Sequence, residues 1–133
     1  MTNSILIGKV IYKLLKEDPD LKGYIGSRIF PLVAENDTNY PFITYSRDTI
    51  FPSMSTKDGS HEDTCNFSIL IVSDEYMNSL EIANICRRIF EKRTIISESM
   101  ILEYISMTDI TEEYSENAYT QRIGFTCKIT NVG

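Results

Sequence analysis

His61 is the only histidine of the chain, so any general base titrating near neutral pH would have to be this residue. A histidine-rich metal site is excluded, and a catalytic triad would depend on His61 alone. It stands beside Glu62 and Asp63 at the start of a predicted strand, where a solvated hairpin position accounts for it. No nucleophile–base pair is visible. The sequence therefore predicts no catalytic residue, and we do not expect an enzyme.

Cysteine is the second residue type that could carry chemistry. Cys65, Cys86 and Cys127 are odd in number, widely separated and without a CxxC pair. This pattern favours free thiols in a reducing compartment over a disulfide framework. Each cysteine falls on a predicted inward face, which is typical of a small buried hydrophobic residue. A metal or redox role is the alternative.

The remaining charged and glycine-rich motifs are explained by structural roles and do not indicate a functional site. Gly23-x-x-Gly26 lacks the GK[ST] continuation of a phosphate loop and does not follow a strand. The acidic side chains of residues 109–116 match no metal-ligand spacing, which favours a solvated loop. A basic cluster suits the C-terminal end of a helix, where cations are stabilised; it comprises Arg87, Arg88, Lys92 and Arg93. We therefore expect no cofactor and no metal.

Size and charge limit the classes of protein that remain. With 133 residues, 42% of them apolar and 24% charged, the chain is predicted to form a single domain, residues 1–133. Its formal net charge of −6 argues against sequence-specific nucleic-acid binding, which depends on Lys and Arg. No stretch approaches the length of apolar residues that spans a bilayer, and the N-terminus lacks a signal-peptide pattern. We expect an intracellular protein without a membrane partner.

Two amphipathic helices and about five strands are predicted. Apolar residues recur at helical spacing over residues 4–17, with Ser4 as the cap, and again over the helix that Ser73 opens and that ends near residue 92. Residues 20–26 are predicted to be a short turn or helical loop, and residues 111–117 the acidic loop that joins the last two strands into a hairpin. The predicted strands are residues 28–32, 41–47, 62–72, 100–110 and 119–130.

Alternation within the third strand predicts how the sheet is buried. Cys65, Phe67, Ile69 and Ile71 fall on one face, with polar residues between them. With two amphipathic helices, this predicts an α+β fold: one antiparallel β-sheet of about five strands, two helices packed on one face, order α-β-β-β-α-β-β.

The connection between the second and third strands is long for a hairpin and carries apolar residues. Such connections usually take about 2–5 residues, whereas Ile50, Phe51 and Met54 stand in a segment that continues to residue 60. Either these side chains fold back onto the sheet, or they contact another subunit.

Several motifs in order resemble one protein family. A helix ending in Glu17-Asp18-Pro19, then Arg28-Ile29-Phe30-Pro31, then Tyr40-Pro41 opening a strand, is similar to the tail-completion (tail-terminator, head–tail joining) proteins of long-tailed phages and prophages. The strand over 65–72 and the helix over 73–92 continue the likeness, which covers roughly residues 5–92.

This resemblance implies a structural protein without an active site. Such proteins form a ring, usually of six subunits, that caps the tail tube and docks onto the head connector. It implies a location in the virion tail and, during assembly, in the host cytoplasm. We hypothesise that five side chains contact a neighbouring subunit or the tube: Tyr40, Tyr45, Ile50, Phe51 and Met54. The alternative is a small cytoplasmic ligand-binding or regulatory domain, dimeric through a sheet edge.

Overall fold

The computed structural model describes residues 2–52 and 62–131. The helices are a short 3-10 helix η1 (Ser4–Leu6), α1 (Ile7–Glu17), α2 (Pro19–Ile25) and α3 (Tyr76–Phe90). The strands are β1 (Ile29–Pro31), β2 (Phe42–Pro52), β3 (Asp63–Ser73), β4 (Ile95–Ile96), β5 (Met100–Ser115) and β6 (Ala118–Asn131).

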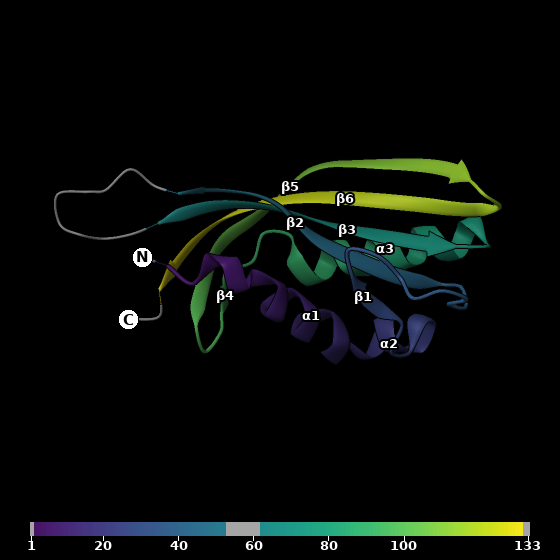
Figure 1. Ribbon diagram of the computed structural model, residues 1–133, viewed down its shortest axis with the longest axis horizontal. Helices are drawn as coiled ribbons and strands as arrows, with labels where there is room; N and C mark the ends of the chain where they lie inside the picture. The colour runs from purple at the N-terminus through teal and green to yellow at the C-terminus, as the bar shows by residue number, and fades with distance from the viewer. Residues whose placement is uncertain (1, 53–61, 132–133) are drawn as a thin grey trace, which may run out of the picture.

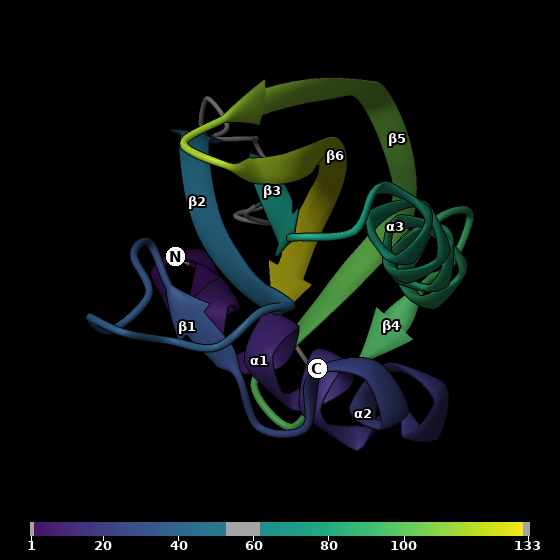
Figure 2. The same cartoon turned by 90° about the vertical axis from the view of Figure 1, so that its right-hand side faces the viewer.

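One curled sheet organises the molecule. Its order is β1-β2-β3-β6-β5-β4, with β1 parallel to β2 and every other neighbouring pair antiparallel. The sheet bends into a half-barrel that holds the helices on its concave side (Figure 2). In Figure 1 the long strands run across the view, and α1 and α2 lie below β2, β3 and β6. Within residues 2–52 and 62–131, no helix lies on the convex face of the sheet (Figure 2).

The predicted fold class is wrong. Strand residues dominate, at 47% against 30% helical, so the protein is mostly β, with a mixed six-stranded sheet and three helices in place of an antiparallel five-stranded sheet with two. The helix not counted in that prediction is α2, where a short turn or helical loop was expected. Pro19 occupies its first position, and the Asp18 carboxylate accepts the Leu21 N–H at 3.0 Å. The proline that ends α1 thus begins α2.

The sheet edges account for the rest of the error. β1 pairs parallel to β2, Ile29 with Ile43, because the connection over residues 32–41 carries the chain back to the end of the sheet at which β1 begins. β4 is only two residues long, too short for alternation to be detected. Edge strands of this length leave almost no pattern in a sequence.

The predicted closing hairpin is confirmed, but most of the acidic segment 111–117 belongs to its strands and not to its loop. β5 and β6 pair up to Ser115 and Ala118, and only Glu116 and Asn117 lie between them. Both have positive φ, 53° and 65°, the combination that a two-residue type I′ turn requires. The hairpin therefore projects as paired strands to the end of the molecule (Figure 1).

Neither predicted serine cap forms. α1 is preceded by η1, and the Ser4 hydroxyl donates to the Asp63 carboxylate on β3. The Ser73 hydroxyl accepts the Glu75 N–H, and α3 begins only at Tyr76. Ser4 therefore connects the start of η1 to β3, and Ser73 stabilises the turn between β3 and α3.

Three phenylalanines form the centre of the core. Phe67 of β3, Phe90 of α3 and Phe125 of β6 are each at most 1% exposed, and their ring centroids lie 5.2–5.5 Å apart. The predicted inward face of β3 is confirmed, because Cys65, Phe67, Ile69 and Ile71 are all fully buried. These contacts fasten α3 to the two central strands.

Replacing Phe67 by alanine is expected to lower the free energy of unfolding by about 3–5 kcal/mol, since it opens a cavity at this junction. Phe51→Ala is the matched control. Phe51 is 59% exposed, so its truncation should change stability by less than about 0.5 kcal/mol. Urea denaturation followed by circular dichroism measures both. Similar losses in the two variants would contradict the described core.

Candidate interaction surfaces

The thiols are placed where they are poor nucleophiles. Cys65, Cys86 and Cys127 are free and buried. Burial raises the pKa of Cys65 to about 11 and that of Cys127 to about 12, and it raises the pKa of the completely buried Cys86 as well. All three therefore stay protonated at neutral pH, and the thiolate is the reactive form. The predicted inward positions of the cysteines are confirmed.

Other candidate motifs have structural partners. Gly26 ends α2 with φ 58°, and its N–H donates to the Lys22 carbonyl. Arg87 pairs with Glu91 one helical turn further on, while Arg88 reaches Asp18 at 3.0 Å and so connects α3 to the start of α2. His61 lies outside the described residues. Within 2–52 and 62–131, no three His, Cys, Asp or Glu side chains are grouped to hold a metal ion.

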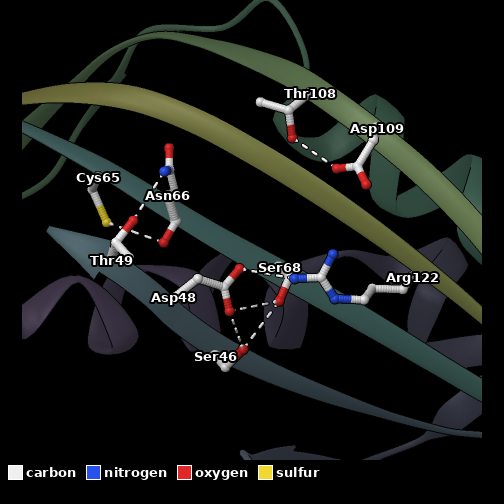
Figure 3. Close-up of polar contacts among 9 residues, drawn as sticks. All are labelled: Ser46, Asp48, Thr49, Cys65, Asn66, Ser68, Thr108, Asp109 and Arg122. Carbon is white, nitrogen blue, oxygen red and sulfur yellow. Dashed lines mark hydrogen bonds and ion pairs between the residues drawn. The ribbon is translucent and has the colours of Figure 1, made fainter.

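A polar network covers part of the convex face (Figure 3). The Asp48 carboxylate accepts hydrogen bonds from Ser46 and Ser68, at 3.0 and 3.2 Å, and pairs with Arg122 at 3.1 Å. Asn66 donates to Thr49 beside it at 2.9 Å. The network suits a solvated sheet surface better than catalysis.

A β-bulge sets which β2 side chains face outward. Pairing with β3 shifts between Arg47 and Thr49, so Asp48 and Thr49 both join the convex face. Beyond the bulge the alternation is reversed. Ile50 then points to the concave side, where it packs against the core, and Phe51 is exposed.

Four of the five residues of the sequence hypothesis lie in the described part of the chain, and these four are not gathered on one surface. Tyr45 is half-buried, packs against the core and lies 6.3 Å from the Tyr12 ring. Tyr40 is 41% exposed and stacks on Phe42 at 5.8 Å beside an open hollow of about 490 Å³. Met54 lies outside the described residues. Of the four described residues, only Tyr40, just before β2, and Phe51, near the end of β2, present large exposed apolar surface.

A cluster that sequence reasoning missed lies at the end of the β5–β6 hairpin. We call it the tyrosine tip: Tyr76, Glu112, Glu113, Tyr114, Tyr119 and Gln121, which line an open hollow of about 250 Å³. The Tyr119 ring lies 4.7 Å from Tyr114 and 5.5 Å from Tyr76. The signal in the sequence was the alternation of Ile110, Glu112 and Tyr114, which continues a strand pattern through the supposed loop.

A second missed surface lies between α1 and the β4–β5 turn. We call it the lysine groove, and its volume is about 430 Å³. Its apolar lining includes Leu6, Leu14 and Ile96, of which Ile96 is 72% exposed. Lys9 and Lys13 line it one helical turn apart, together with Glu17 and Glu98.

No helix in residues 2–52 or 62–131 is long and apolar enough to cross a membrane.

Comparison with known proteins identifies the fold. No protein-family model matches the sequence, and no curated protein matches it. Among solved structures, a chain from the virion of a native gene transfer agent (GTA) particle is similar, with a TM-score of 0.72. The match covers 90% of this chain and 91% of that chain at 12% sequence identity. The two chains therefore share a fold over nearly their whole lengths.

The buried thiols should make stability fall at high pH. Their pKa values are raised from 9.0 by burial, so the folded state holds these protons more tightly than the unfolded chain. This stability is fully present below pH about 9 and is lost as the pH rises through the folded-state values, by up to about 1.4 kcal/mol per pH unit for each thiol. Denaturation at pH about 8 and about 10 tests this. In Cys127→Ala the free energy of unfolding should fall less between these two pH values than in the wild type. An equal fall in both proteins would contradict a raised pKa of the Cys127 thiol.

Proposed function

We propose that this chain is a structural subunit of a phage-like particle, and specifically a tail-completion protein. It would form a ring at the head-proximal end of the tail tube and join the tail to the head. The observation that carries the proposal is the shared fold with a chain of a gene transfer agent virion, which extends over nine-tenths of both chains. A match of this coverage involves the whole domain and not an isolated motif.

The residues that resemble the tail-completion family support the same proposal. They fall on α1, α2, β1 and the start of β2, which are successive elements of the structure. Arg28 donates to the carbonyls of Pro41 and Tyr24, at 2.8 and 3.2 Å, and so connects the Arg28–Pro31 motif to the Tyr40-Pro41 motif. The motifs that follow one another in the sequence are therefore also in contact in the folded chain.

A ring of identical subunits needs two different patches that complement each other. The exposed apolar side chains of this chain lie at separated places, among them Phe51, Ile96 and Tyr114. We propose a six-membered ring, with the tail tube and the head connector as its further partners. Tyr40 and Phe51 remain candidates for contacts with a neighbouring subunit or the tube, and Met54 continues the same segment. The particle tail, and the host cytoplasm before assembly, are the proposed locations.

Deleting the gene from the phage or prophage that encodes it tests this function. The expected result is tailless heads together with unattached tails of irregular length in negative-stain electron micrographs. Supplying the wild-type chain from a plasmid should restore joined particles. Normal joined particles without the protein would exclude the proposal. A stable twofold dimer that leaves particle assembly unchanged would favour the ligand-binding or regulatory alternative.

Phe51→Asp tests the exposed apolar side chain on β2. If Phe51 lies in an interface, burying a carboxylate there should lower the yield of joined particles by about tenfold or more, which corresponds to about 1.4 kcal/mol. Tyr104→Asp is the matched control, since Tyr104 is also an exposed aromatic residue, at 72%. Equal yields from Phe51→Asp and wild type would remove Phe51 from the interface, and loss of the circular dichroism spectrum would assign it to the core.

A further inference from the structure

The tyrosine tip has the composition of a cation-binding pocket. Three tyrosine rings surround a hollow that two glutamates also line. Tyr114 is 58% exposed and Tyr76 is 39% exposed. Tyrosine faces attract ammonium and guanidinium groups through the ring quadrupole. A basic side chain that enters this hollow would meet aromatic faces and carboxylates together.

The Glu112 carboxylate is held in place by neutral donors. Tyr76 donates its hydroxyl at 3.0 Å, and the buried Gln121 amide donates at 2.9 Å while also reaching the Ser79 hydroxyl. The hydrogen bond to Glu112 raises the pKa of Tyr76, so the phenol remains a donor. In the described part of the chain no cation pairs with Glu112. The tip therefore presents a fixed and unbalanced negative charge.

The lysine groove carries the complementary groups. Lys9 and Lys13 make no ion pair or hydrogen bond with the described residues, in contrast to Arg87, Arg88 and Arg122. Beside them are the exposed Leu6 and Ile96; at the tip Tyr114 is exposed, and so is Met77, which follows Tyr76 in α3. The tip thus combines apolar area with negative charge, and the groove combines apolar area with two lysines that have no partner within the described residues, together with Glu17 and Glu98.

The two surfaces lie toward opposite ends of the molecule. The β5–β6 hairpin ends at one extreme of the long axis, whereas η1 and β4 lie toward the other (Figure 1). The tip and the groove of one molecule therefore do not meet each other. A contact between unlike patches on successive copies is heterologous and closes into a ring when the rotation allows.

We propose that the tyrosine tip of one copy binds the lysine groove of the next. Lys9 or Lys13 enters the hollow between the tyrosine rings and faces Glu112 and Glu113, while Tyr114 and Met77 cover the apolar lining at Leu6 and Ile96. The proposal deepens the proposed function and rests on it, since it names the pair of patches that a ring of this chain would use.

Cysteine cross-linking of the purified full chain tests the contact even if association is weak. Ser115→Cys is exposed beside the tip, and Glu98→Cys lines the groove; the three native thiols are buried. Oxidation at millimolar protein concentration should give disulfide-linked dimers and a ladder of higher oligomers. The matched control pairs Ser115→Cys with Glu35→Cys, an exposed acid in the β1–β2 connection. A ladder no stronger than in the control would overturn the proposal.

Charge exchange then tests the pairing itself. On the cross-linking background, Glu113→Lys with Glu116→Lys makes the tip basic, and Lys9→Glu with Lys13→Glu makes the groove acidic. Each variant alone should cross-link about tenfold less than the background, because like charges then meet. An equal mixture should recover the ladder, since each copy again finds an opposite charge. Folded variants that cross-link normally alone, or fail to recover when mixed, would exclude this charge pairing.

These outcomes are separate from those of the gene deletion. Cross-linking uses purified protein and needs no tail or head, so it can succeed in a chain that plays no part in particle assembly. If deletion abolishes joined particles and cross-linking fails, the function stands and the interface lies elsewhere. If cross-linking succeeds and particles form without the protein, the chain self-associates for another purpose.

Discussion

The structure depends on covering one face of a curled sheet. Phe67, Phe90 and Phe125 join α3 to the two central strands, and each ring contacts the other two at 5.2–5.5 Å. Because the sheet bends around the helices, its concave face forms the core, and the described helices leave its convex face uncovered (Figure 2). That division explains why the convex face carries the Asp48 network and why the thiols, on the concave side, are protonated. Because helices cover only one face of the sheet, the thiols on the covered face are unreactive, and the uncovered surface is available for contacts with other molecules.

The same constraint leaves the ends of the molecule open. β5 and β6 are 16 and 14 residues long and extend to a two-residue turn at the end of the molecule. α3 begins beside this hairpin end, at Tyr76, whose ring packs on Tyr119 of β6. The tyrosines of the hairpin therefore pack on one another, on the start of α3 and around Glu112. The tyrosine tip is a consequence of strand length as much as of composition.

Prediction from the sequence succeeded for elements in which apolar residues recur with a regular period over many residues and face the core. The inward face of β3, the burial of the three cysteines and the apolar side of α1 all follow from periods of two or 3.6 residues. It failed where one residue decides the geometry. Pro19 begins α2 while also ending α1, Glu116 and Asn117 turn the chain through positive φ, and the bulge at Asp48 reverses which face Ile50 and Phe51 occupy. The tyrosine tip was missed because charge was interpreted as a loop signal, although acidic residues are common on an exposed hairpin.

The motifs that resemble the tail-completion family make contacts within the chain that hold its elements together. Arg28 connects α2 to β2 through the carbonyls of Tyr24 and Pro41, and the Phe30 ring lies 6.4 Å from Phe42, on which Tyr40 stacks. These residues hold the edge strand β1, whose position was predicted from the sequence but whose parallel pairing was not. A chain can therefore keep this local arrangement and present quite different side chains at its tip and groove. This is why a likeness of motifs and fold supports a class of particle protein, whereas the partner surfaces have to be argued from the charges and exposed rings of this chain itself.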